Sequence, residues 1–163
     1  MVRVPTAETN PDGGSGDWLS NIGGFHFFVE DVQEGVSKEK QTPSLDVTCV
    51  VLAGTDQSQV GRKTVNSLYL TPKNYNKLAE FAIAVGLITR EDWKTAKDAG
   101  TDLEFDEQQM IGRSFCAEVE WDEYNGKKRP KIGFKVWDPR DPKAAHIPKD
   151  AAGASGEDWG ALV

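Results

Sequence analysis

Apolar residues recur at every second position in five stretches of the chain, a pattern typical of β-strands with one buried face. The predicted strands are residues 25–32, 45–52, 62–70, 115–121 and 131–137. The Asn125-Gly126 pair between the last two is a strong signal for a hairpin turn. The sequence therefore predicts three strands in its first half and a two-stranded hairpin near its end.

The same alternation predicts which side chains are buried. The odd-numbered residues from Phe25 to Val29 share one face of the first strand, and Phe28 lies on the other. Phe28 is then either an exposed stacking residue or a residue packed beneath a loop. Tyr69 lies between two leucines and Trp121 continues an apolar face, so core packing is favoured for both. The expected apolar face of the last strand consists of Ile132, Phe134 and Val136.

The hydrophobic period changes between the third and fourth strands. Four apolar residues from Leu78 to Val85 recur at helical spacing between Thr71-Pro72 and Gly86. A capping box from Thr89 to Asp92 predicts a second short helix, and residues 106–109 can cap one further turn. The predicted order is three strands, a helical segment and then two strands. This is the order of the five-stranded OB fold. We therefore expect a mainly β protein, an OB-fold barrel with a helical insert between strands 3 and 4.

The barrel is expected to span residues 22–138, between two flexible tails. Residues 1–21 are rich in small and polar residues and predict a disordered N-terminal tail, in which Trp18 and Leu19 either pack on the domain or await a partner. Residues 139–163 predict a flexible C-terminal tail with an acidic, aromatic and apolar tip. No apolar run suggests a membrane helix or a secretory signal, so a cytoplasmic protein is expected.

The net charge of −7 argues against nucleic acid, but the charges are unevenly distributed. Many acids lie between Glu91 and Glu107, in the helical segment. In contrast, five basic residues and no acidic one lie between Asn125 and Val136, in the hairpin that borders the ligand groove of an OB barrel. The alternative interpretation of this run is a solvated hairpin with ordinary surface lysines.

Cations beside aromatic side chains suit a single strand of nucleic acid, because cations neutralise phosphates and flat rings stack on unpaired bases. The candidate nucleic-acid-binding residues are Phe28, Lys38, Lys40, Arg62, Lys63, Tyr69, Tyr124, Lys127, Lys128, Arg129, Lys131, Lys135 and Trp137.

The remaining chemistry of the sequence favours no enzyme and no cofactor. Cys49 and Cys116 lie in separate apolar runs, so two buried reduced thiols are expected, with a disulfide as the alternative. Neither His26 nor His146 has a partner at metal-ligand spacing. The acids of residues 102–107 leave a metal-dependent nuclease as a third hypothesis. The favoured interpretation of these acids is that they stabilise helix starts and lie on a solvated face.

Several segments resemble the phage and prophage single-stranded DNA-binding proteins of replication and recombination loci. The resemblance covers about residues 22–138 and rests on patterns of moderate specificity. These are residues 24–32 (GFHFFVEDV), Ser37-Lys38 with 43–47 (PSLDV), 61–63 (GRK), 78–87, 112–115 (GRSF) and 124–126 (YNG) followed by the basic strand.

The resemblance implies an OB fold and single-stranded DNA binding without an enzymatic step; RNA and homo-oligomer formation stay open. It also implies a tail that recruits replication or recombination proteins in a bacterial or phage-infected cell. The tail residues that fit this role are Glu157, Asp158, Trp159, Leu162 and Val163. The alternative is an OB-like protein-interaction module that binds no nucleic acid.

Overall fold

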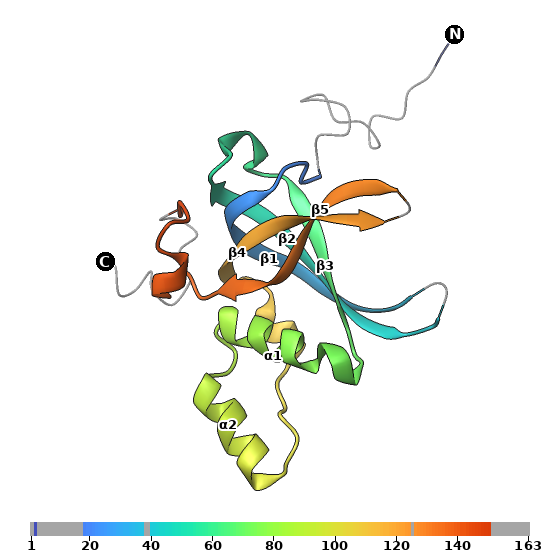
Figure 1. Ribbon diagram of the computed structural model, residues 1–163, viewed down its shortest axis with the longest axis vertical. Helices are drawn as coiled ribbons and strands as arrows, with labels where there is room; N and C mark the ends of the chain where they lie inside the picture. The colour runs from blue at the N-terminus through green and yellow to red at the C-terminus, as the bar shows by residue number, and fades with distance from the viewer. Residues whose placement is uncertain (1, 3–17, 38–39, 125, 151–163) are drawn as a thin grey trace.

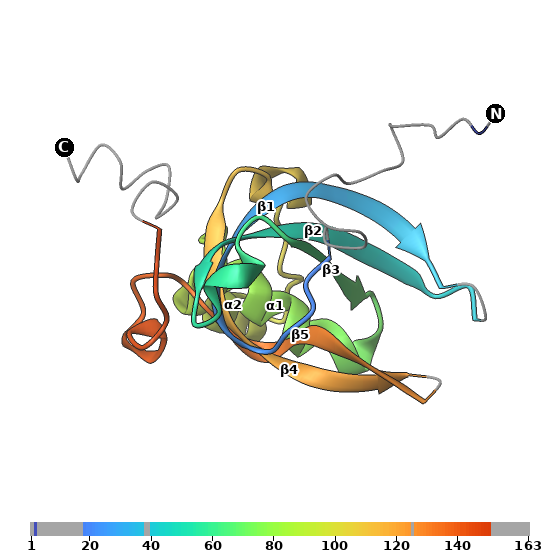
Figure 2. The ribbon, with the colours of Figure 1, turned by 90° about the horizontal axis from the view of Figure 1, so that it is seen from above.

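The computed structural model describes residues 2, 18–37, 40–124 and 126–150 (Figure 1). Five strands form one antiparallel sheet in the order β3-β2-β1-β4-β5. Their bounds are β1 Gly23–Val36, β2 Pro43–Gly54, β3 Lys63–Tyr69, β4 Ser114–Tyr124 and β5 Lys127–Trp137. The mainly β class and the five strands are confirmed. The sheet curves strongly, as seen in Figure 2, but no ladder between β3 and β5 closes its described part into the expected barrel.

The helical segment lies between β3 and β4, as expected. A short 3₁₀ turn, Pro72–Asn74, leads into α1, Tyr75–Ala84, and α2 spans Arg90–Ala99 before a second 3₁₀ turn, Glu107–Met110. The predicted capping box of Thr89 and Asp92 forms in full, and Gly100 ends α2 in the left-handed conformation with φ of 69°. Local sequence signals therefore determine where α2 begins and ends.

A chain of contacts between four phenylalanines joins the sheet to α1. Phe27 of β1 lies opposite Phe115 of β4, and their rings stack with centroids 5.3 Å apart. Phe81 of α1 meets Phe115 edge-on at 4.9 Å, and Phe25 lies 6.0 Å from Phe27. All four side chains are buried, so the predicted inward face of β1 and the predicted inner stripe of α1 are confirmed.

Bulges change which residues are buried in two strands. In β1 the register shifts between Val29 and Asp31, so the buried positions change from odd to even numbers and Val32 is the next buried residue. In β5 the stretch from Ile132 to Val136 advances four residues, while the paired stretch of β4, from Val119 to Ala117, advances only two. The expectation that Phe134 is buried is therefore wrong: its side chain is 60% exposed, because the extra residues of the bulge turn it outward.

Trp121 is also not in the core, where the sequence placed it. Its side chain is 46% exposed. Pairing between β1 and β4 ends at Val119, and beyond this point β4 and β5 continue as a two-stranded ribbon (Figure 1). The apolar alternation of β4 thus continues past the last element able to cover it.

The packed part of the chain extends beyond residues 22–138 on both sides. Leu19 is buried in the main core, and Trp18 forms a parallel bridge with Lys63 at the free edge of β3. Residues 138–150 fold back on the other side, where Ile147 packs with Cys116 and partly buried Trp137. This C-terminal segment was expected to be part of a flexible tail.

Both cysteines are free and buried, which confirms the prediction of two reduced core thiols. Burial raises the pKa of both thiols, that of Cys116 to about 12. In the described residues, no helix is long and apolar enough to cross a membrane.

The C-terminal segment supplies the first prediction. Replacing buried Ile147 with Ala should lower the free energy of unfolding by about 2–5 kcal/mol, because it removes apolar contacts in a packed site. Denaturant unfolding measures this, with Pro148→Ala as an exposed control in the same segment. An unchanged midpoint for Ile147→Ala would mean that residues 139–150 do not belong to the folded unit.

His26 supplies a second prediction. It is fully buried, its Nδ1 accepts a hydrogen bond from the Asp150 N–H at 3.1 Å, and burial lowers its pKa from 6.5 to about 4. The unfolded chain therefore binds more protons than the folded one between these values, so stability is full above pH 6.5 and falls as the pH drops towards 4.

The contribution of His26 to the free energy of unfolding is expected to fall by about 2 kcal/mol between about pH 7 and pH 5. Urea unfolding of the protein and of His26→Gln at both pH values isolates this contribution, because the other titrating groups are common to both. Equal pH dependence in the two proteins would contradict the assignment of His26 as a buried neutral side chain.

Candidate nucleic-acid interface

A cleft separates the two edge strands, β3 and β5. Its volume is about 470 Å³, within the range of roughly 300–1,000 Å³ typical of ligand sites. The β1–β2 and β4–β5 hairpins project beyond the sheet on the same side of the molecule (Figures 1 and 2). The residues lining the cleft are Trp18, Leu19, Lys63, Thr64, Val65, Asn66, Ser67, Tyr69, Arg129, Pro130 and Lys131.

Two aromatic side chains are exposed in the lining of this cleft. Trp18 is 56% exposed, and its backbone is fixed by the bridge to Lys63 and by Arg62 Nη1, which donates to the Trp18 carbonyl oxygen at 3.1 Å. Tyr69 is 37% exposed, because the alternation of β3 places its neighbour Leu68 inside. The expectation of core packing for Tyr69 is therefore wrong. Both rings are accessible to a flat ligand.

The cations of the cleft are paired with carboxylates at the surface. Lys63 Nζ lies 2.9 Å from Glu30 Oε1, while Arg129 Nε and Lys131 Nζ lie 3.8 and 3.9 Å from Asp122 Oδ2. All of these side chains are substantially exposed, and exposed ion pairs are typically worth about 0–1 kcal/mol. Each cation can thus exchange its carboxylate for a ligand anion at small cost.

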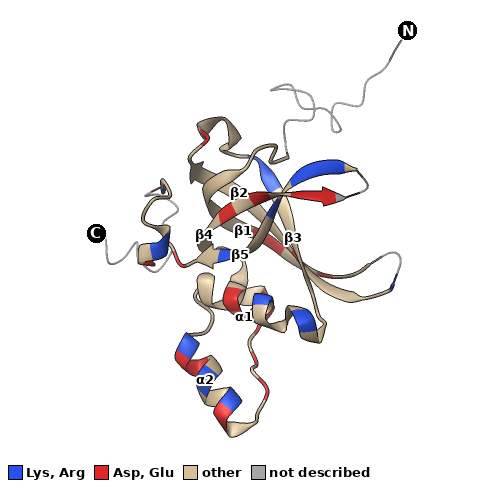
Figure 3. Cartoon of the chain, in the orientation of Figure 1, with Lys and Arg blue, Asp and Glu red and all other residues tan. Residues whose placement is uncertain are grey.

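The β4–β5 hairpin carries less net positive charge than its basic run suggests. Lys128 and Arg129 lie directly opposite Glu123 and Asp122 on β4, and Lys131 lies opposite Glu120. In Figure 3 the blue of β5 runs beside the red of β4. Three of the five cations of β5 therefore lie opposite an acid of β4, and a fourth, Lys135, has its Nζ near Glu120. Lys127 and Lys128 are exposed near the hairpin end.

The outer face of β1 and β2 adjoins the cleft. Phe28 lies opposite Val50, which in turn lies opposite Lys63, so these three residues form one row across the strands. The Phe28 side chain is half-buried. Farther along the same face, Asp31 and Asp46 introduce negative charge. Lys40 is exposed beside the β1–β2 hairpin.

Among the described candidates only Lys63, Tyr69, Arg129 and Lys131 line the cleft, and the two at the far end of β5, Lys135 and Trp137, have partners elsewhere. Lys135 lies inside the bulge of β5, and its Nζ is 3.7 Å from Glu120 Oε1. Trp137 pairs with Cys116 and packs against Ile147, and its ring meets that of His146 edge-on at 6.2 Å. The bulge and the folded C-terminal segment are the physical reasons that Trp137 does not share an open face with Lys131.

Other candidates lie outside the described residues. They are Lys38, the side chain of Tyr124, and the tail residues Glu157, Asp158, Trp159, Leu162 and Val163.

Phe134 is an exposed aromatic that sequence analysis missed. The nearly buried Lys77 of α1 lies beneath it, with Nζ 5.9 Å from the ring centroid. Burial, and secondarily the charge of Lys131, lowers the pKa of Lys77, while Asp122 opposes this shift. Gly133 is the sequence feature that could have indicated the exposure of Phe134, because a glycine inside a strand often marks a bulge.

Of the acids in the nuclease hypothesis, which the sequence disfavoured, Asp106 has a structural contact. Asp106 caps the turn that follows it by accepting the Gln108 N–H at 3.0 Å, and Asp102 and Glu104 are exposed. Among the residues that the structure describes, no three His, Cys, Asp or Glu side chains are grouped to hold a metal ion.

Comparison with known proteins adds no assignment. No family model matches the chain, and no curated protein matches it.

Proposed function

We propose that this protein binds single-stranded nucleic acid, primarily DNA, in the cleft between β3 and β5, without strong sequence preference and without an enzymatic step. The observation that supports this most directly is the composition of the cleft. Two accessible aromatic rings, Trp18 and Tyr69, lie in one cavity with Lys63, Arg129 and Lys131. Cations near stacking rings are the combination that non-specific binding of a single strand requires.

The sheet supports the proposal at the level of the fold. Strand order β3-β2-β1-β4-β5 with a helix between β3 and β4 corresponds to an OB barrel opened between its edge strands. OB folds bind oligonucleotides on the face of strands 2 and 3, between the β1–β2 and β4–β5 loops. In this chain the corresponding hairpins project on one side of the molecule (Figure 1), and the proposed cleft is lined by residues of β3 and β5.

In the proposed mode of binding, the strand lies along the cleft between the hairpins. Lys63, Arg129 and Lys131 exchange their surface carboxylates for phosphates, and unpaired bases stack on Trp18 and Tyr69. The exposed Lys127 and Lys128 bind further phosphates where the strand leaves the cleft past the end of the β4–β5 hairpin. Each stacked base contributes about 1–3 kcal/mol and is read by its flat face, so the preference among bases is weak. A duplex hides these faces, which explains the preference for a single strand.

A second part of the proposal concerns the C-terminal end. The described chain ends at Asp150, on the side of the molecule away from the two hairpins (Figures 1 and 2). The acidic and apolar residues 157–163 then act as a tether that recruits replication or recombination proteins in the cytoplasm of a bacterial or phage-infected cell.

Charge balance favours a second candidate function, a protein-interaction module. The cleft cations are paired with acids, Asp31 and Asp46 lie on the adjoining face, and the net charge is −7.

Fluorescence anisotropy with labelled single and double strands at two salt concentrations separates the candidates. Preferential single-strand binding supports our proposal, whereas no binding of either strand at low salt would favour the interaction module.

The hairpin supplies a third prediction. Replacing Lys127, Lys128 and Arg129 with Ala should weaken binding of the single strand and flatten its salt dependence. Each phosphate contact contributes about −0.7 to the slope of log K against log salt, so losing three contacts reduces the slope by about 2. The control replaces Lys94 and Lys97, exposed on α2, with Ala. An unchanged slope in the hairpin variant would contradict phosphate binding by this loop.

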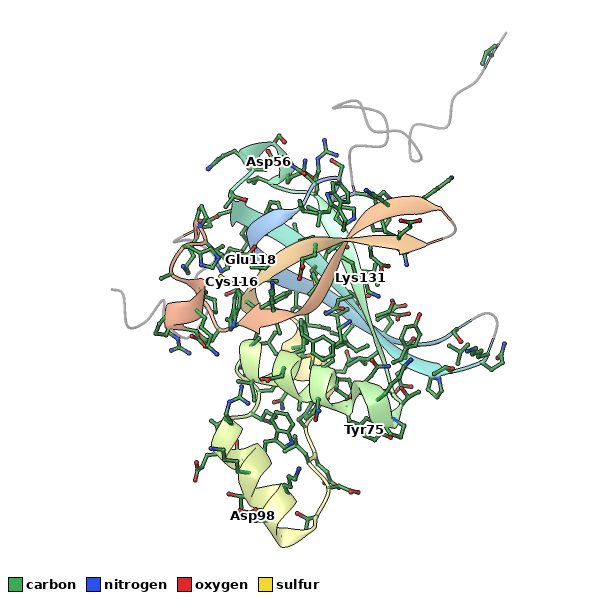
Figure 4. The ribbon with its side chains drawn as sticks, in the orientation of Figure 1. Asp56, Tyr75, Asp98, Cys116, Glu118 and Lys131 are labelled. Carbon is green, nitrogen blue, oxygen red and sulfur yellow. The ribbon has the colours of Figure 1, made fainter. Side chains whose placement is uncertain are left out.

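Asp122 supplies a fourth prediction, in the opposite direction. Asp122→Asn removes the carboxylate that pairs with Arg129 and Lys131, so single-strand affinity should rise several-fold at low salt. The matched control is Asp98→Asn on α2, which Figure 4 shows far from Lys131. Anisotropy titrations of both variants measure the change. Equal affinities for Asp122→Asn and the unmodified protein would remove Arg129 and Lys131 from the proposed interface.

A further inference from the structure

One side chain lining the cleft is polar, buried and without a partner. Asn66 of β3 is 3% exposed, and it points inward on the same strand face as Leu68. Among the residues that the structure describes, neither its amide nitrogen nor its amide oxygen has a hydrogen-bond partner. The other buried polar side chain with an unpartnered atom, His26, still has one ring nitrogen hydrogen-bonded to Asp150.

This arrangement is costly for folding. An unpaired buried polar group costs about 1–3 kcal/mol, and asparagine is disfavoured inside strands. Its cross-strand partner is Val47 of β2, which is buried and apolar, so an aliphatic side chain at position 66 would suit its surroundings better. Asn66 lines the cleft with its amide buried, so a small opening between β3 and β5 would let a ligand in the cleft reach and satisfy both polar atoms.

The chemistry of the amide restricts what that ligand is. An asparagine side chain offers one acceptor and a pair of donors side by side. A phosphate has acceptors alone and cannot satisfy the amide oxygen, whereas the edge of a nucleobase presents a donor next to an acceptor. The cations of the cleft, Lys63 and Lys131, remain suited to the phosphates on either side. Figure 4 shows Lys131 on β5 where this strand passes β3.

We propose that the cleft is a nucleobase pocket, in which Asn66 hydrogen-bonds the edge of one unstacked base while neighbouring bases stack on Trp18 and Tyr69. This inference rests on the proposed function and deepens it, since it assigns base recognition to a residue distinct from the phosphate-binding cations. The tilt of one base towards Asn66 requires a small opening between β3 and β5, which no ladder joins in the described part of the sheet.

The test compares a strand with bases and a strand without them. Anisotropy gives the dissociation constants of labelled oligothymidylate and of an abasic strand of equal length, about 12 nucleotides. The proteins are the full chain, Asn66→Leu, and Val85→Ala as a control for stability at a buried site outside the cleft. Asn66→Val replaces Asn66→Leu if the latter does not fold, and thermal unfolding is recorded for every variant.

The proposal predicts that Asn66→Leu weakens binding of oligothymidylate about tenfold, leaves binding of the abasic strand unchanged, and unfolds at the same or a higher temperature. Val85→Ala should unfold at a lower temperature with both dissociation constants unchanged. Unchanged oligothymidylate binding by Asn66→Leu, or an equal loss on both strands, would overturn the role of Asn66 while leaving single-strand binding intact. Failure of the unmodified protein to bind either strand would instead overturn the proposed function, and this inference with it.

Discussion

The stacking of Phe27 on Phe115 is the contact on which the rest of the structure depends. The pair lies within the β1–β4 ladder, and because β1 also pairs with β2 on its other edge, β1 is the central strand of the sheet. Phe81 of α1 packs edge-on against the same ring, which holds the helical segment beneath the sheet. Strands β3 and β5, far apart in the sequence, are thereby left as the two edges. The curvature of the sheet brings these edges to opposite sides of one cleft.

The cleft combines features that arise from separate parts of the chain. Trp18 reaches it because the segment before β1 pairs with the edge of β3, and Arg129 and Lys131 reach it because β5 passes the same edge. The cations are balanced by acids on β4 and β1, so long-range attraction of a polyanion is weak. Binding by this surface would depend on short-range exchange of ion pairs and on stacking, and it would weaken as salt rises.

The local order of elements was predictable from the sequence, because strand alternation, the Thr89 capping box and the Asn125-Gly126 turn are each encoded within a few residues. The features that depend on distant residues were not. The exposure of Trp121 follows from where β1 stops, and that of Phe134 follows from a bulge in β5. The lysines of β5 looked unopposed because their partners, Glu120 to Glu123, lie in the preceding strand. Composition also placed residues 139–150 in a tail, although Ile147 completes a buried cluster.

The central claim is that the cleft between β3 and β5 receives a single strand. Amide chemical shifts of the ¹⁵N-labelled protein, followed during titration with unlabelled oligothymidylate at low salt, test this claim residue by residue. The account predicts that the largest changes lie in Lys63–Tyr69, in residues 129–131 and at Trp18, with α2 unaffected. Changes confined to α2 or to residues 139–150, or none at all, would contradict it.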